Sequence, residues 1–289
     1  MASSTPLVWL ITGTSSGIGR ELALAALRRG EKVIATTRAR SMPQLDDLKA
    51  QGAAVLEMDI TVPLNDLHKV AEKAIAIYGH VDVLVNNAGA FLACGATEEI
   101  SPEDTFSQYN LNLFGSLNVA RAFLPYMRKR RSGKVVWIGS LTGWQPTPAL
   151  SMYASVKHAM RGISETMDIE ISPLGLRSIN IEPGYFRSKL IDPNNRNLYN
   201  NTIADYKEAM EGMDAIFKSL DGTQPGDSAK LGEAIVDIIK GQGKAAGKTI
   251  PRSLQLGDDC YEVVKKELTD RLQILEEWKE VTTGLNVSK

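Results

Sequence analysis

Two side chains one helical turn apart suggest proton-transfer chemistry. Tyr153 and Lys157 are four residues apart in the segment 149–171, whose apolar spacing predicts a helix, so both side chains share one face. An ammonium beside a phenol stabilises the phenolate and lowers the pKa of the tyrosine from about 10. The pair therefore predicts Tyr153 as a general acid or base that Lys157 tunes. Ser140, at the end of a predicted strand, would hydrogen-bond a substrate carbonyl or hydroxyl. Tyr-x-x-x-Lys pairs also occur on amphipathic helices without catalytic roles, so this pair needs support from the rest of the chain.

A glycine-rich segment near the start of the chain has the composition of a phosphate-binding loop. Residues 12–19 read TGTSSGIG and connect a predicted strand to a predicted helix. Glycine permits positive φ and close approach of a ligand, and the free N–H groups at a helix start favour a pyrophosphate. The spacing is Gly-x-x-x-Gly-x-Gly, which differs from the commonest dinucleotide-binding pattern. The segment predicts a dinucleotide site, with an ordinary glycine-rich turn as the alternative.

The end of the second predicted strand bears on which dinucleotide would bind. The run 32–37 ends in Thr37, and Arg38 follows it. A NAD site needs an acid there to hold the ribose 2′-hydroxyl, whereas an arginine accommodates a 2′-phosphate. A guanidinium without a neighbouring carboxylate therefore favours NADP(H). The alternative is that Arg38 is a solvated loop charge.

Strand-like runs alternate with helix-like segments along most of the chain. The strand-like runs are residues 7–12, 32–37, 54–58, 81–85, 134–138 and 177–181. The helix-like segments are residues 17–29, 44–51, 64–78, 102–130 (with a break near its start) and 149–171. This alternation predicts a single-domain, doubly wound parallel α/β sheet of the Rossmann type over residues 1–289, with ligands at the carboxyl ends of the strands.

The last third of the chain departs from this alternation. Residues 187–225 are turn-rich and polar before a helix-like stretch at 204–217, which predicts a substrate lid. A helix at 228–240, a short strand at 253–256 and a helix at 260–279 follow, so residues 258–289 form a C-terminal helical extension.

The composition excludes several classes of function. The chain has 289 residues, with 33 Lys plus Arg against 34 Asp plus Glu, so no positive excess is available for nucleic acid or an anionic membrane. Cys94 and Cys260 cannot build a disulfide framework, and free thiols in a reducing compartment are the expectation. We find no secretory signal or membrane span, and expect a cytoplasmic protein. The three histidines do not cluster, so we expect no metal site.

These motifs occur together and in order, and on them the chain resembles the short-chain dehydrogenase/reductase family from Leu7 to Ser188. The matching pieces are TGxxxGIG at 12–19, Asp59, Asn-Asn-Ala-Gly at 86–89, Asn112, Ser140, Tyr153-x-x-x-Lys157 and Pro183-Gly184. The Thr-Thr-Arg end of the second strand, the Pro-Gly-Tyr-Phe-Arg run and the long extension are most similar to the hydroxysteroid-dehydrogenase-like branch. The family often has a threonine shortly after Pro-Gly, where this chain has Arg187-Ser188.

The resemblance implies a role for each matching position. Asn112, Ser140, Tyr153 and Lys157 would form a catalytic tetrad in which Asn112 helps to place a water joined to Lys157. The implied cofactor contacts are Gly13, Ser15, Ser16, Gly17, Ile18, Gly19, Thr37, Arg38, Asp59, Ile60, Asn87, Ala88, Gly89, Tyr153, Lys157, Pro183, Gly184, Phe186 and Ser188. A homodimer or homotetramer through the helices at 105–130 and 150–172 is also implied.

The function predicted from these observations is an NADP(H)-dependent carbonyl reductase or alcohol dehydrogenase. Aromatic residues near the site suggest a medium-sized hydrophobic carbonyl or alcohol substrate: Phe91, Trp144, Tyr185, Phe186 and Phe217. Two alternatives stay open, because a fold alone does not determine function. One is a non-redox cyclase, epimerase or dehydratase of specialised metabolism on the same scaffold. The other is a regulatory protein that binds NADP(H) without turnover.

Overall fold

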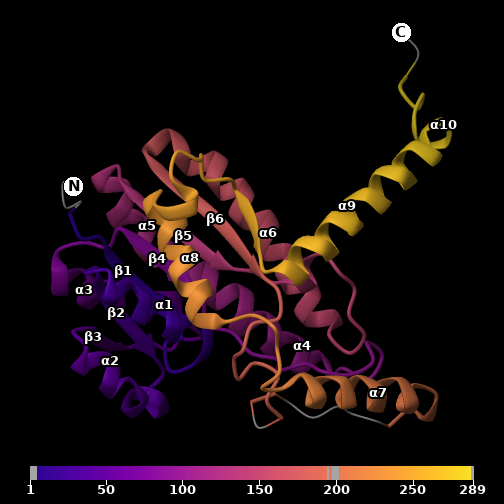
Figure 1. Ribbon diagram of the computed structural model, residues 1–289, viewed down its shortest axis with the longest axis horizontal. Helices are drawn as coiled ribbons and strands as arrows, with labels where there is room; N and C mark the ends of the chain where they lie inside the picture. Colours follow the sequence, from indigo (N-terminus) through magenta and orange to yellow (C-terminus); the bar gives the residue numbers. More distant parts are fainter. Residues whose placement is uncertain (1–4, 194, 197–201, 288–289) are drawn as a thin grey trace.

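A seven-stranded parallel sheet forms the centre of the molecule (Figure 1). The structure is a computed structural model that describes residues 5–193, 195, 196 and 202–287. The strands lie in the order β3-β2-β1-β4-β5-β6-β7, and all adjacent pairs are parallel. Their bounds are β1 Val8–Thr12, β2 Lys32–Thr37, β3 Ala54–Glu57, β4 Val83–Asn86, β5 Gly133–Ile138, β6 Leu176–Pro183 and β7 Ser253–Leu256. The strand order reverses between β1 and β4, where a doubly wound sheet opens a crevice for ligands.

Helices cover both faces of the sheet, as the sequence predicts for strands with apolar residues on both sides. One face packs against α1 (Gly17–Arg28), α2 (Asp46–Ala50) and α8 (Ser228–Lys240). The other packs against α3 (Leu64–Tyr78), α5 (Ser116–Arg130) and α6 (Ser151–Ile171). Trp9 and Trp137 are completely buried, one in each apolar layer. The predicted fold class, one doubly wound α/β domain, is confirmed.

The long helix predicted over 102–130 is interrupted in its first half, after the eight residues of α4. It consists of α4 (Pro102–Tyr109), the π-helical segment η2 (Asn110–Gly115) and α5. A π turn inserts an extra residue into a helix and often occurs at functional sites. Here a neighbouring loop packs closely, since a Cβ atom on Gly115 would lie 2.7 Å from the carbonyl oxygen of Ile60. The position of the π-helical segment is therefore indicated by its contacts with other loops, and not by a residue that breaks the helix locally.

Helix α6 begins at Ser151, two residues later than predicted. Ala149 has a φ of 66°, in the left-handed region, so an α-helix cannot start there. The remaining short helical segments are η1 (Ala39–Leu45), η3 (Leu141–Gly143), η4 (Ser172–Leu174) and η5 (Gly243–Ala245).

The predicted lid contains one long helix, α7 (Ala204–Leu220), which crosses the carboxyl ends of the strands (Figure 1). Residues 194 and 197–201 of the lid, and residues 288 and 289, lie outside the described part of the chain. The C-terminal extension begins as α9 (Asp258–Glu277), directly after β7, and runs outward from the body to α10 (Lys279–Thr282) (Figure 1). Within the described residues, no helix combines the length and apolarity needed to cross a membrane.

Candidate functional site

The glycine-rich loop leaves β1 and enters α1 through two residues with positive φ. Gly13 has a φ of 71° and Gly17 a φ of 59°, conformations that residues with a side chain rarely adopt. Gly19 needs its small size for another reason, because a Cβ atom there would lie 2.3 Å from Nδ2 of Asn87. The three glycines therefore shape the loop in two ways, by backbone conformation and by close packing.

The loop after β4 is bonded directly to the glycine-rich loop. Nδ2 of Asn87 donates to the carbonyl oxygens of Thr12 at 2.8 Å and Gly13 at 3.1 Å. Oγ1 of Thr12 accepts from the backbone N–H groups of Asn87 and Ala88. A Cβ atom on Gly89 would lie 2.6 Å from Oδ1 of Asn112. The Asn-Asn-Ala-Gly segment thus joins the predicted phosphate loop to the helix that carries Asn112.

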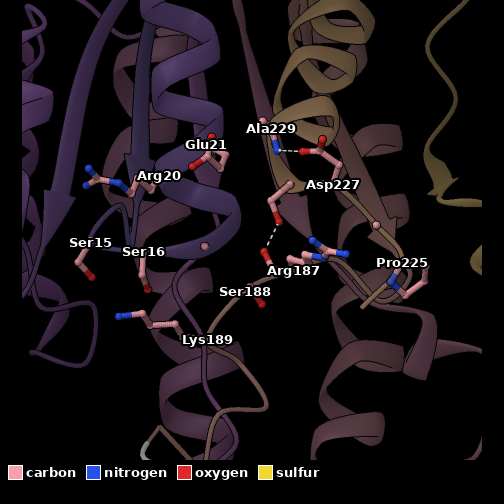
Figure 2. Close-up of a pocket in the computed structure, with 13 residues that line it drawn as sticks. Ser15, Ser16, Arg20, Glu21, Arg187, Ser188, Lys189, Pro225, Asp227 and Ala229 are labelled. Atoms are coloured by element: carbon pink, nitrogen blue, oxygen red, sulfur yellow. Dashed lines mark hydrogen bonds between the residues drawn. The ribbon is translucent and has the colours of Figure 1, made fainter. Parts of the chain in front are cut away.

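The start of α1 fits a pyrophosphate. Ser16 is the N-cap, but its side chain makes no hydrogen bond to the first N–H groups of the helix. A hollow of about 730 Å³ lies between Ser15, Ser16, residues 187–189 of the lid and residues 225–229 (Figure 2). Ser188 approaches the loop, since a Cβ atom on Gly17 would be 3.1 Å from its Cβ. Helix N–H donors beside a hollow match the chemistry of a phosphate group.

Three cations that line this hollow were not among the residues predicted from the sequence: Arg20, Arg187 and Lys189. Arg187 and Lys189 both line it from the start of the lid (Figure 2). Nε of Arg187 donates to the carbonyl oxygen of Gln224 at 3.0 Å, which anchors that side chain to the far end of the lid. For Arg187 and Lys189, the local signal was their position three and five residues after Gly184.

The adenosine end of the crevice is formed by the ends of β2 and β3. Thr37 is buried, whereas Arg38 is exposed. The side chain of Arg38 is therefore accessible to the 2′-phosphate of a cofactor. Asp59 follows β3, and its Oδ1 accepts from the N–H group of Thr61 at 2.9 Å and from its hydroxyl at 2.7 Å. Ile60 is 3% exposed, so its side chain serves mainly as an apolar wall.

Tyr153 and Lys157 lie together on α6, facing the carboxyl ends of the strands. Nζ of Lys157 is 5.2 Å from the centre of the Tyr153 ring and donates to the carbonyl oxygen of Ile138 at 2.7 Å. Ser140 follows β5 two residues after Ile138, and its Oγ accepts from the hydroxyl of Thr142 at 2.9 Å. The structure thus brings these three predicted residues to one place. Both Tyr153 and Lys157 are at least 95% buried, with 4% and 5% of their surface exposed.

Burial dominates the ionisation of this pair. Desolvation raises the pKa of Tyr153 well above its usual value, although hydrogen bonding with Ser140 opposes the shift. Desolvation also lowers the pKa of Lys157 to about 8, and the charge of Glu182 opposes that shift. The pKa of Tyr153 is therefore raised and not lowered, because burial penalises the phenolate more than the hydrogen bond with Ser140 stabilises it.

Asn112 lies in the π-helical segment and is fully buried. Its Nδ2 donates to the carbonyl oxygens of Ala90 and Gln108, both at 3.0 Å, and its Oδ1 accepts from the N–H group of Ala90 at 3.1 Å. Gln108, which the sequence did not suggest, binds the same loop through the N–H groups of Leu92 and Ala93. These two amides fix the loop that carries Phe91 against Tyr153, whereas the role of Asn112 in placing a water stays a prediction.

The turn after β6 is held by the start of the C-terminal extension. Oδ2 of Asp259 accepts from the N–H group of Tyr185 at 2.6 Å, and a Cβ atom on Gly184 would lie 2.1 Å from Oδ1 of Asp259. The ring of Phe186 lies against Gly226, where a Cβ atom would be 2.5 Å from it. Pro183 is buried at the end of β6. The side chain of Phe186 therefore packs against the protein, and the predicted cofactor contacts of this turn stay a prediction.

Both cysteines, Cys94 and Cys260, are buried free thiols. Burial raises the pKa of Cys94 to about 11 and that of Cys260 to about 12, so neither is a reactive thiolate near neutral pH. Over the described ranges, no group of three or more His, Cys, Asp or Glu side chains is arranged to hold a metal ion.

Comparison with known proteins gives a consistent picture. A model of the short chain dehydrogenase family matches residues 7–198. A 3-ketodihydrosphingosine reductase from Bacteroides thetaiotaomicron is 33% identical over 236 residues, or 81% of this chain and 84% of that protein. A short-chain dehydrogenase structure from Streptomyces avermitilis has a TM-score of 0.85 and 34% identity, covering 98% of this chain and 100% of that chain. A short-chain dehydrogenase/reductase from Burkholderia phymatum in complex with NAD shares the fold at 20% identity, with a TM-score of 0.76 over 100% and 99% of the two chains.

Proposed function

This chain belongs to the short-chain dehydrogenase family, and on that premise we propose that it is an NADP(H)-dependent carbonyl reductase of a medium-sized hydrophobic ketone or aldehyde. One observation carries the proposal. The Lys157 ammonium lies 5.2 Å from the ring of Tyr153, at the carboxyl ends of the strands and on the crevice side of the sheet. A phenol and an ammonium so placed form an acid–base pair for carbonyl chemistry.

The protein's own groups divide the chemistry between them. A nicotinamide cofactor bound along the crevice would supply the hydride. Tyr153, whose high pKa keeps the phenol protonated, would donate its proton to the carbonyl oxygen of the substrate. Ser140 would hydrogen-bond that oxygen as negative charge develops on it. Lys157 would stabilise the phenolate that remains, and the apolar cluster around Tyr153 excludes water.

The proposal of NADP(H) over NAD(H) rests on Thr37 and Arg38. The β2 end carries no carboxylate to repel a 2′-phosphate, and the exposed Arg38 makes no ion pair within the described chain. The donors at the start of α1 and the nearby Lys189 would hold the pyrophosphate. The hydroxysteroid-dehydrogenase-like branch stays a prediction.

The substrate side of the site is apolar. Tyr153 packs in a cluster with Phe91, Leu150, Ile191 and Phe217, so a bound substrate would contact apolar side chains. A second hollow of about 490 Å³ opens beside the lid, next to Tyr206 and Met210. The name of the Bacteroides thetaiotaomicron relative states that it reduces a ketone, which supports the same substrate class for this chain.

We also propose a homo-oligomer. Three large apolar side chains are exposed on α4, η2 and α6, at Phe106 (62%), Phe114 (42%) and Ile169 (57%). Exposed apolar groups on neighbouring helices favour association. Analytical ultracentrifugation would measure the oligomeric state, and a monomer at micromolar concentration would contradict the proposal of a homo-oligomer.

The test of the function is a titration followed by a substrate screen. NADPH should bind more tightly than NADH, and loss of nicotinamide absorbance should follow addition of hydrophobic ketones or aldehydes. Consumption of a substrate without loss of NADPH would favour the non-redox alternative. Tight NADPH binding with no turnover on a broad panel would favour a regulatory protein.

A further inference from the structure

We propose that Glu182 is a positioning residue for proton transfer: its buried carboxylate binds Arg161, one helical turn after Lys157, and Trp144 in the turn after Ser140. This inference rests on the proposed function, because it assigns a role to a buried carboxylate that acts on the same acid–base pair. Glu182 precedes Pro183-Gly184 on β6 and is not exposed at all.

Five side chains donate hydrogen bonds to the Glu182 carboxylate. They are Trp144 at 2.7 Å, Arg161 at 3.4 Å, Asn180 at 2.9 Å, Ser253 at 2.9 Å and Gln255 at 2.7 Å. The donors come from the turn after Ser140, from α6, from β6 itself and from β7. A buried carboxylate is stable only when such donors satisfy it, and here its oxygens are satisfied by neutral groups and one guanidinium.

The carboxylate lies on the face of the sheet that α6 covers. Arg161 is one helical turn after Lys157 on α6, and its guanidinium is 4.0 Å from the ring centre of Trp144. A Cβ atom on Gly143 would lie 3.5 Å from the backbone carbonyl of Lys157 and 3.6 Å from Oε1 of Glu182. Gly143 therefore lies close to both the helix that carries the acid–base pair and the carboxylate.

The charges around Lys157 explain what the carboxylate does. Tyr153 and Arg161 face it from α6, and Glu182 faces it from β6, while Asp259 and Cys260 of α9 adjoin Glu182. Burial pushes Lys157 towards its neutral form, and the charge of Glu182 opposes that effect. The phenolate left on Tyr153 after proton donation needs the ammonium, so the charge of Glu182 acts on catalysis through Lys157.

The same carboxylate connects the C-terminal segments to the site. Ser253 and Gln255 of β7 contribute two of the five donors, and Sγ of Cys260 donates to the backbone oxygen of Glu182 at 3.3 Å. The side chain of Trp144 is held through its indole N–H, which orients the segment between Ser140 and Tyr153. A residue that sequence motifs leave out thus joins three separate parts of the chain beneath the acid–base pair.

The test compares Glu182→Gln with the wild-type enzyme over pH. The alkaline limb of the kcat/KM profile for carbonyl reduction should move down by about one pH unit, because an opposite charge near an amine is lost. A side-chain NMR titration of Lys157 in the ligand-free protein, assigned with Lys157→Met, should move in the same direction. Glu182→Asp keeps the negative charge, so the alkaline limb and the Lys157 titration should both stay close to those of the wild type.

Asp168→Asn is the matched control for loss of a buried carboxylate. Asp168 is 4% exposed and binds Arg177, Arg252 and the N–H group of Ser178. Its replacement should reduce stability without moving the alkaline limb or the Lys157 titration. If Asp168→Asn moves them as far as Glu182→Gln does, the effect is general loosening, and the proposal is overturned.

Arg161→Gln should shift the alkaline limb and the Lys157 titration in the opposite direction. This variant still tests the proposal if Glu182→Gln does not fold. Removing this cation leaves the charge of Glu182 less neutralised, so the alkaline limb and the Lys157 titration should move to higher pH. An unmoved Lys157 titration in Glu182→Gln or Arg161→Gln, whichever folds, would overturn the proposal. If the wild type reduces no carbonyl but the Lys157 titration shifts as described, the proposed function fails, and the electrostatic link between Glu182 and Lys157 stands.

Discussion

The ring of Phe91 stands edge-on to the ring of Tyr153, with ring centres 4.4 Å apart and planes at 84°. Phe217 of the lid helix lies behind Phe91, with its ring centre 6.3 Å away. This aromatic stack excludes water from the phenol and accounts for the raised pKa of Tyr153. The protonated phenol is consequently the resting form, which suits a proton donor in reduction.

Replacement of this phenol tests its role as the acid. Tyr153→Phe should keep cofactor affinity and lower kcat by about 10²–10⁴-fold, the usual contribution of a general acid. Steady-state rates and a fluorescence titration with NADPH measure the two effects. Tyr109→Phe removes a hydroxyl that lies 2.7 Å from Oγ of Ser155, and as the control it should turn over normally. Near-normal rates in Tyr153→Phe would remove this residue from the mechanism.

Cofactor preference should depend on the end of β2. The double variant Thr37→Asp/Arg38→Ala should weaken NADPH binding and strengthen NADH binding, because a carboxylate repels the 2′-phosphate and accepts from a 2′-hydroxyl. Dissociation constants for both cofactors provide the measurement. Lys69→Ala, which removes a charge on α3 that is 72% exposed, serves as the control. An unchanged NADPH-to-NADH ratio would show that Arg38 does not contact the phosphate.

Activity and stability should respond to alkaline pH in opposite directions. Lys157 has a folded-state pKa of about 8, below its ordinary value of 10.5, so above pH 8 the unfolded chain binds more protons there. The unfolding free energy of wild type relative to Lys157→Met should therefore rise by on the order of 2 kcal/mol towards pH 10. Over the same range kcat/KM should fall as the ammonium deprotonates. A stability difference that is flat or falls with pH would contradict the lowered pKa.

Two glycines on helices should respond in opposite ways to alanine. Gly19→Ala places a Cβ atom 2.3 Å from Nδ2 of Asn87 and 2.7 Å from the carbonyl oxygen of Gly13, so it should lower the melting temperature and weaken NADPH binding. Gly162→Ala meets nothing within 4 Å on α6 and should stabilise by about 0.5–1 kcal/mol, from helix propensity. Thermal melts of both variants test the pair. Equal stability of Gly19→Ala and wild type would show that the contact with Asn87 is dispensable.

Features that depend on local pattern could be predicted from the sequence. The run VWLIT at Val8–Thr12 became a completely buried strand, and the four-residue spacing of Tyr153 and Lys157 put both side chains on one helix face. Ser253–Leu256 was also predicted correctly as a strand. Each of these follows from the period of a helix or a strand, which is readable within a short window.

Features that depend on distant partners were missed. The π turn at Asn110–Gly115 arises where Asn112 binds the backbone of Ala90, 22 residues away. The importance of Glu182 has no local signal, because its donors Ser253 and Gln255 are 71 and 73 positions further along. The raised pKa of Tyr153 likewise depends on an aromatic cluster that forms only when the lid packs against the sheet.

The position of β7 has a consequence for synthesis of the protein. Once translation has passed Ser188, every residue of the predicted tetrad has been added, but the Glu182 carboxylate still lacks Ser253 and Gln255. Burial of a carboxylate that lacks two of its donors is unfavourable, so we expect this region to complete its packing only after β7 has been synthesised. Variants that slow docking of β7 should therefore delay the appearance of activity after the other strands have assembled.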